Sequence, residues 1–187
     1  MTNPDQLFFY EDPHKEALDF AKNRPSCFVM PLGGFSKDAA MSALSLGYEI
    51  ANFNNLHKLD HVILDAGTGL QAASCLVALE EMGFKGQAHV ICMGPLDFKS
   101  VLEQVSLWTQ KAAPRFKIHV MRPFIAKAYG SSNRTLKHFQ DEFFQKTGIV
   151  LDTVYNAKSF YTMYELQKQG LIQGNCLIVH SGGTYSA

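Results

Sequence analysis

The chain of 187 residues is long enough for one domain with a substantial core, and its composition, 47% hydrophobic and 18% charged, is that of a globular protein. Its 17 basic residues balance its 17 acidic ones, so no global field draws it to nucleic acid or to an anionic membrane, and neither is an expected partner. No apolar stretch reaches the roughly 18 residues of a membrane span, and the opening residues lack the pattern of a signal peptide, so we expect a cytoplasmic protein.

The four cysteines are scattered along the chain without a C-x-x-C pair. Three of them lie inside apolar runs, where a buried free thiol is the expected state. This pattern indicates a reducing compartment rather than a zinc site or a disulfide framework. We therefore expect no metal site.

Short apolar runs alternate with longer helical patterns along most of the chain. The runs are four to six residues long and predict strands buried on both faces at 27–30, 61–66, 89–93, 116–121, 148–152 and 176–180. Helices are predicted near 14–22, 36–53, 70–82, 98–111, 132–148 and 157–169.

This alternation predicts the fold class and the domain organisation. Strands that alternate with helices through short loops form right-handed βαβ units, so we expect an α/β fold with a mainly parallel sheet and helices on both faces, in three layers. Residues 26–187 are assigned to this domain. Residues 1–25 are interpreted as a lead-in segment, a remnant of an N-terminal part that is missing here.

Ligands of parallel sheets bind outside the carboxyl ends of the strands, and here these ends carry glycines, hydroxyls and tyrosines. Gly67-Thr68-Gly69 stands between a strand and a helix, where backbone N–H groups can hold a phosphate, although ordinary turn chemistry explains the same residues. Gly33-Gly34 favours a plain turn. His180 and Ser181 are neighbours on a strand and point to opposite faces, which argues against a catalytic pair.

The stretch from Gly67 to Ala72 also matches the G-x-G-x-x-A form of a dinucleotide-binding fingerprint. That mechanism needs an acidic residue at the end of the next strand to hold the ribose. The next strand ends at Cys92-Met93-Gly94-Pro95, and Asp97 comes too late. A nucleotide-dependent oxidoreductase is therefore the third of our three hypotheses.

Several strand ends together resemble the C-terminal half of the D-cysteine desulfhydrase and 1-aminocyclopropane-1-carboxylate deaminase family. These are pyridoxal-phosphate enzymes of fold type II, the tryptophan-synthase-β-like fold. Residues 151–161 resemble the family segment D-P-V-Y-T/E-G-K, and 178–183 resemble its H-T/L-G-G ending. Upstream, 31–36 resemble P-x-G-G-S-N, 67–69 stand at the glycine-rich phosphate loop, and Tyr129-Gly130 resembles the Y-G segment.

The resemblance implies a role for each of these residues. Gly67, Thr68 and Gly69 would hold the phosphate of pyridoxal 5'-phosphate through their backbone N–H groups. Asn156 and Ser181 would lie near the ring nitrogen, and Gly182 would complete that wall of the cofactor pocket. Tyr155 and Tyr129 would be the catalytic pair, with Tyr155 against the ring or reaching the substrate, and Tyr129 on the side of a small amino-acid substrate.

The departures from the family are as informative as the matches. The Schiff-base lysine of the family lies in an N-K-x-R-K segment that has no counterpart here. Lys158 matches a family lysine that does not bind the cofactor covalently, and Lys37 falls where the family has no lysine. Phe35, Leu70 and Asn156 replace a serine, a small residue, and a threonine or glutamate.

Two further hypotheses follow from this comparison. The first is a fragment or short form of a deaminase or desulfhydrase that acts on D-cysteine or 1-aminocyclopropane-1-carboxylate and is inactive alone. The second is a non-catalytic relative that binds pyridoxal phosphate, another small phosphate ligand or a partner protein. Because loss of the N-terminal half would uncover sheet edges and apolar surface, we expect a homo-oligomer.

Overall fold

The computed structural model describes residues 13–53 and 56–182, and the chain divides into two compact units, 1–36 and 37–187. The first unit contains helix α1 (Pro13–Ala21) and the short 3-10 turn η1 (Leu32–Gly34). The predicted strand at 27–30 is wrong, because this segment is irregular and leaves Phe28 and Met30 largely exposed. A strand forms only where a neighbouring strand completes its hydrogen bonds, and the described residues of this unit offer none.

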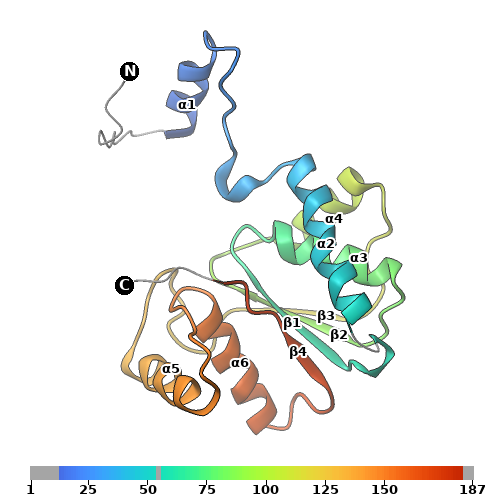
Figure 1. Ribbon diagram of the computed structural model, residues 1–187, viewed down its shortest axis with the longest axis vertical. Coiled ribbons are helices and arrows are strands. Elements are labelled where there is room, and N and C mark those ends of the chain that lie inside the picture. The colour runs from blue at the N-terminus through green and yellow to red at the C-terminus, as the bar shows by residue number, and fades with distance from the viewer. Residues whose placement is uncertain (1–12, 54–55, 183–187) are drawn as a thin grey trace. The chain divides into compact units, whose positions relative to one another are not determined.

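The second unit is an α/β domain. Its elements in chain order are α2 (Lys37–Phe53), η2 (Leu56–Lys58), β1 (His61–Ala66), α3 (Leu70–Glu81), β2 (Gln87–Cys92), α4 (Phe98–Thr109), β3 (Ile118–Met121), α5 (Arg134–Thr147), α6 (Asn156–Lys168) and β4 (Cys176–Ile178). The strands described here form one sheet in the order β3-β2-β1-β4, and every neighbouring pair is parallel. Figure 1 shows α2, α3 and α4 on one side of this sheet and α5 and α6 on the other. The predicted fold class is confirmed.

The core of the unit is built on the two central strands. Val62, Ile63 and Leu64 of β1 are almost completely buried, as are Val90 and Ile91 of β2. Such continuous apolar runs belong to strands that are covered by helices on both faces. Helix α3, which follows β1, is buried along nearly its whole length, so it forms the central helix of its layer.

The predicted strand at 148–152 is also wrong. Ile149 and Val150 are about half exposed, and only Leu151 and Asp152 of this run are buried. Leu151 packs with apolar side chains of α5 and α6 instead of joining the sheet. The apolar run therefore closes the contact between two helices, a role that sequence periodicity alone does not separate from that of a buried strand.

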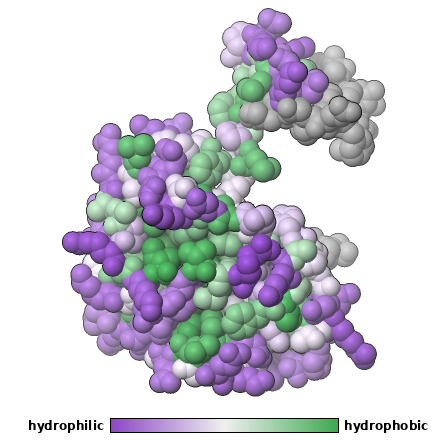
Figure 2. Space-filling view, turned by 180° about the vertical axis from the view of Figure 1, so that it is seen from behind, coloured by the Kyte–Doolittle hydropathy of each residue, from purple (hydrophilic) through white to green (hydrophobic). Residues whose placement is uncertain are grey.

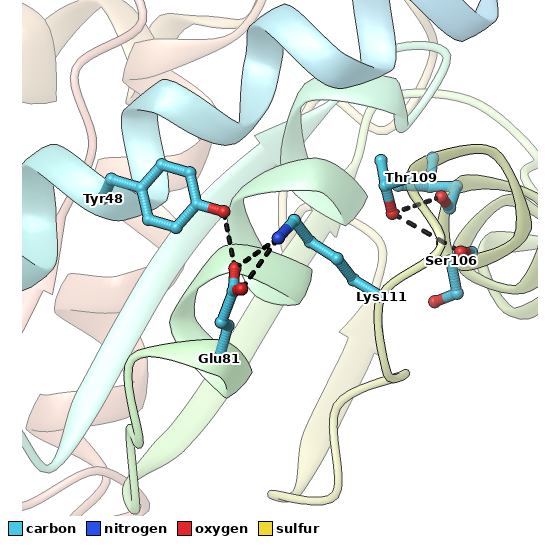
Figure 3. Close-up of polar contacts among 6 residues, drawn as sticks. Tyr48, Glu81, Ser106, Thr109 and Lys111 are labelled. Carbon is cyan, nitrogen blue, oxygen red and sulfur yellow. Dashed lines mark hydrogen bonds and ion pairs between the residues drawn. The ribbon is translucent and has the colours of Figure 1, made fainter.

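A polar network connects α2, the end of α3 and the segment after α4, in the helix layer opposite α5 and α6. The Tyr48 hydroxyl of α2 donates to Glu81 at the end of α3, with an O···O distance of 2.5 Å, and Lys111 Nζ, beyond α4, lies 2.7 and 2.8 Å from the two Glu81 carboxylate oxygens (Figure 3). The hydrogen bonds from Lys111 and Tyr48 lower the pKa of Glu81. Because α3 runs back from the carboxyl end of β1, this network lies at the opposite edge of the sheet from the predicted site.

No helix within residues 13–53 and 56–182 is both long enough and apolar enough to cross a membrane.

Candidate functional site

The first component of the site is the turn that joins β1 to α3. Gly69 adopts a left-handed conformation with φ 83° and stands as the N-cap of α3, where it has no side chain to bond the first amides of the helix. Leu70 and Ala72 are buried, so this helix end is shielded on its protein side. Free amides and the positive end of the helix dipole at a partly shielded terminus favour binding of an anion.

Tyr155 lies directly against this turn. A Cβ atom added to Gly67 would stand 2.9 Å from Tyr155 Oη, which is closer than ordinary packing allows. Glycine at position 67 therefore leaves room for the phenol to approach the backbone. The turn at 67–69 and Tyr155, both selected from the sequence, therefore lie side by side.

Asp152 organises the segment that carries Tyr155. One of its carboxylate oxygens accepts hydrogen bonds from the amides of Val154 and Tyr155, at 2.8 Å each. The other accepts from the backbone amide and the side-chain amide of Asn156, at 2.9 and 2.6 Å. This nearly buried carboxylate thus holds in place the turn before α6 and the first residue of that helix.

Asn156 connects α6 to the segment after β4. It is completely buried, and its Oδ1 accepts a hydrogen bond from the backbone amide of Ser181 at 3.1 Å. The Ser181 hydroxyl donates to Asp65 Oδ2, near the end of β1, at 2.7 Å. Two of the residues predicted for the ring-nitrogen end of a cofactor site therefore meet, and they meet an acid that the sequence analysis did not select.

Tyr129 and Tyr155 form a hydroxyl pair. Their oxygens are 3.2 Å apart, and their rings meet edge to face with centroids separated by 6.0 Å. Burial raises the pKa of Tyr155, and the hydrogen bond with Tyr129 raises it further. Tyr155 is therefore protonated at neutral pH and acts as a hydrogen-bond donor, or as a source of protons, rather than as a base.

Lys158 supports the turn before Tyr129. Its side chain is fully buried, and Nζ donates to the backbone carbonyl of Ala128 at 2.8 Å. Burial lowers the pKa of Lys158, and the nearby Arg122 guanidinium lowers it further. The amine is occupied by the protein backbone, whereas Lys37 is exposed at the first residue of α2.

The remaining predicted residues are placed as follows. Thr68 is partly exposed within the turn, and Gly182 has φ 90° with its amide donating to His180 Nδ1 at 3.2 Å. His180 Nε2 lies 2.9 Å from the carbonyl oxygen of Val150, so both ring nitrogens are used in backbone contacts. Gly183, quoted in the sequence comparison, lies outside the described residues, and Gly33-Gly34 belongs to the first unit.

Asp65 is the site residue that sequence reasoning missed. A signal for it exists: it is the single charged residue in the otherwise apolar stretch from 62 to 66. A carboxylate in a buried strand needs a partner, and Ser181 supplies one. Within the described residues, no three or more His, Cys, Asp or Glu side chains gather in a group that could hold a metal ion.

Comparison with known proteins gives relatives in sequence and in fold. Two curated relatives, from Pyrococcus furiosus and Pyrococcus horikoshii, are each named "Putative 1-aminocyclopropane-1-carboxylate deaminase" and are 23% identical over 185 residues and 24% identical over 183 residues. A crystal structure described as that of an ACC deaminase homologue matches with a TM-score of 0.78 at 19% identity, over 95% of this chain and 57% of its own. No family model matches the chain. The chain is a distant homologue of the ACC deaminase family.

This relationship covers only part of the relatives. The two sequence matches include 95% of this chain but 56% and 55% of the Pyrococcus proteins, so the chain spans about half the length of the curated relatives it matches. The resemblance expected from the sequence is confirmed. Its restriction to one part of the family protein agrees with these coverages.

Proposed function

We propose that the chain is the cofactor-holding half of a pyridoxal-phosphate-dependent deaminase or desulfhydrase acting on a small amino acid of the 1-aminocyclopropane-1-carboxylate or D-cysteine type. The observation that carries this proposal is the N-terminus of α3, without a side-chain cap and preceded by Gly67-Thr68-Gly69 beneath Tyr155. A turn of this kind fits a phosphate, which accepts from the free amides and is favoured by the helix dipole.

The other residues of the site fit the rest of such a ligand. Tyr155 offers a flat, partly buried ring and a protonated hydroxyl, and Tyr129 shares a hydrogen bond with it at the exposed side. The cofactor, when bound, supplies an electron sink for the substrate carbanion. The part of this chain is to hold the phosphate, to align the ring against Tyr155, and to present the protonated phenol of Tyr155 to the substrate.

Within the described residues, neither Lys158 nor Lys37 is placed as a covalent anchor of the cofactor. Lys158 Nζ donates a hydrogen bond to the Ala128 carbonyl, and Lys37 is exposed on α2. We therefore propose that a lysine from another segment or another subunit completes the enzyme and that the chain is inactive alone. The same observation favours the alternative function, a non-catalytic phosphate binder.

The free thiols of Cys75, Cys92 and Cys176 support a cytoplasmic location.

Charge at the turn tests the phosphate site. We expect Thr68→Asp to weaken binding of pyridoxal 5'-phosphate about tenfold or more, because a carboxylate there repels the phosphate. Thr68→Asn is the matched control, because asparagine has nearly the shape of aspartate without its charge. Its dissociation constant is expected within about threefold of that of the parent chain. Isothermal titration calorimetry measures both affinities, and thermal melts confirm that the variants fold. Equal affinities of the two variants would refute the phosphate site.

A second measurement separates the enzyme from the non-catalytic binder. The chain is mixed with pyridoxal 5'-phosphate, reduced with borohydride and analysed by mass spectrometry. We expect no single lysine to be labelled in stoichiometric amount. One fully labelled lysine would show that the chain carries its own anchor, and would contradict the proposal that another segment supplies it.

We also propose that the chain self-associates. Within the described residues, β3 and β4 each have a strand neighbour on one side only, and Leu107, Val120 and Leu171 are exposed. Figure 2 shows apolar patches that interrupt the polar surface. Open strand edges and apolar surface are covered in stable proteins. Light scattering is expected to give at least twice the mass of one chain, and a clean monomer would contradict this expectation.

A further inference from the structure

A cavity lies outside the carboxyl ends of β2 and β3. It has a volume of about 400 Å³, and its walls include Cys92 and Leu96 on the β2 side and Val120 and Met121 of β3. Arg122, directly after β3, completes the wall. Among the described residues that line this cavity, Arg122 alone carries a charge. The cavity is therefore a mainly apolar space with one cation.

The topology of the sheet favours a ligand site at this position. The connection after β2 leads to α4 on one face of the sheet, whereas the connection after β3 leads to α5 on the other face (Figure 1). The strand order β3-β2-β1-β4 also reverses here, because the chain passes from β3 at one end of this order to β4 at the other. Parallel sheets bind ligands outside the carboxyl ends of their strands at such a switch point.

The Arg122 guanidinium has donors that the protein does not use. Nη2 donates to the carbonyl oxygen of Met93 at 3.2 Å and to that of Lys127, whereas Nε is buried without a hydrogen-bond partner among the described residues. A guanidinium carries five N–H donors, and these two carbonyls occupy only those of Nη2. Because a buried donor without a partner is unfavourable, a further acceptor that reaches this guanidinium is stabilised.

The charge of Arg122 is also unbalanced. No carboxylate within residues 13–53 and 56–182 forms an ion pair with it. Burial and the Arg122 guanidinium lower the pKa of Lys158, and Asp152 opposes this with a smaller effect. Burial raises the pKa of Cys92 in the cavity wall, and the charge of Arg122 works against that rise. A positive field at a hollow with apolar walls attracts an anion.

We propose that this cavity binds a small organic acid with an apolar tail, whose carboxylate pairs with Arg122. The tail lies against Leu96, Val120 and Met121. A guanidinium suits a carboxylate because their hydrogen bonds are charge-assisted, and apolar walls around one cation are typical of a pocket for such an acid. The inference goes beyond the proposed function and does not require a phosphate at Gly67–Gly69.

The test compares isovalerate with its amide, isovaleramide, which has nearly the same shape without the charge. Ligand-observed saturation-transfer NMR on the full chain measures both dissociation constants. We expect isovalerate to bind at least about tenfold more tightly, because only the acid forms a charge-assisted pair with Arg122. Equal dissociation constants, or no saturable binding of isovalerate by the folded chain, would overturn the proposal.

Val120→Asp and Val120→Asn are a matched pair of variants that leaves the hydrogen bonds of Arg122 in place. Val120 is 48% exposed, so both replacements are compatible with folding. We expect isovalerate to bind about tenfold more weakly to Val120→Asp than to Val120→Asn, since a carboxylate in the wall repels the ligand and competes for Arg122. Equal affinities would contradict the proposed site. Arg122→Gln is expected to lose the preference for the acid over the amide, and the Val120 pair decides if that variant does not fold.

Thr68→Asp distinguishes this cavity from the proposed phosphate site. Its carboxylate is at the turn after β1, so we expect its dissociation constant for isovalerate within about threefold of that of the parent chain. If Thr68→Asp weakens isovalerate binding as much as Val120→Asp does, the acid binds at the turn and the cavity proposal is wrong. If isovalerate binds as expected but pyridoxal 5'-phosphate does not bind, the proposed function fails and this inference stands.

Discussion

Replacing Asp152 with alanine is expected to lower the free energy of unfolding by about 2–4 kcal/mol, a large fraction of the stability of a domain this size. The carboxylate accepts hydrogen bonds from three backbone amides and one side-chain amide, at 2.6–2.9 Å, and it is only 8% exposed. Removing it leaves these donors without partners in a place that water reaches poorly. The cost is that of unsatisfied buried groups, which exceeds the cost of losing an ordinary helix cap.

Urea denaturation followed by circular dichroism measures this loss, and two variants calibrate it. Asp152→Asn keeps one accepting oxygen and is expected to lose less stability. Asp97→Ala removes the cap of α4, where the carboxylate accepts from the amide and the hydroxyl of Ser100 at an exposed position, and its loss is expected to be smaller still. Equal losses for Asp152→Ala and Asp97→Ala would mean that burial of the Asp152 network adds nothing.

The same network explains what the sequence could predict about the site. The pattern Asp152-Thr153-Val154-Tyr155-Asn156 is readable as a motif because the chemistry is local: one carboxylate bonds amides two, three and four residues ahead. Gly67-Thr68-Gly69 is readable for the same reason, since a strand enters the turn and a helix leaves it. Tyr155 and Asn156 were selected through the resemblance of this segment to a family motif, and a short motif of this kind can be recognised because its hydrogen bonds are local.

Contacts between distant segments were beyond that reasoning. Asp65 and Ser181 are far apart in sequence, and their hydrogen bond depends on β4 pairing with β1, with Ile63 opposite Ile178. The apolar run at 148–152 was expected in the sheet because its composition suits a strand, yet Leu151 packs between α5 and α6. Composition shows that a segment is buried but not which neighbour buries it. The apolar run at 27–30 was also predicted to be a strand, and this prediction is wrong because no strand pairs with it in the described part of its unit.

Three histidines on adjacent strands lead to the second large effect. His61 of β1, His89 of β2 and His119 of β3 follow one another across the sheet: His61 Nδ1 is 3.0 Å from His89 Nε2, and the rings of His89 and His119 stack at 4.8 Å between centroids. His61 Nε2 lies 3.0 Å from the Gln173 carbonyl oxygen, to which it donates. A proton added to any ring of the row faces its neighbours as a like charge.

The pH dependence of stability follows from the sign of this effect. Burial lowers the pKa of His89 to about 4, with contributions from His119, His61 and Lys117, and burial also lowers the pKa of His119. As pH falls through the unfolded value of about 6.5, the unfolded chain takes up protons that the folded chain refuses. The contribution of His89 to the free energy of unfolding is therefore fully present above about pH 6.5 and declines as the pH falls to about 4. The total loss is about 3 kcal/mol, of which about 2 kcal/mol is lost by pH 5.

We expect urea midpoints measured from pH 7.5 to pH 5 to fall accordingly, in a range where most carboxylates stay ionised. His89→Gln retains a side-chain amide that can donate to His61 and removes the titrating group, so its midpoints should vary much less with pH, even if its stability at pH 7.5 is lower. His138→Gln is the matched control, because His138 is exposed on α5 beside Glu142, and its pH profile should follow that of the parent chain. The variant differs from the parent chain only in the loss of the His89 imidazole. If its urea midpoints fall with pH as steeply as those of the parent chain, the acid sensitivity does not come from His89.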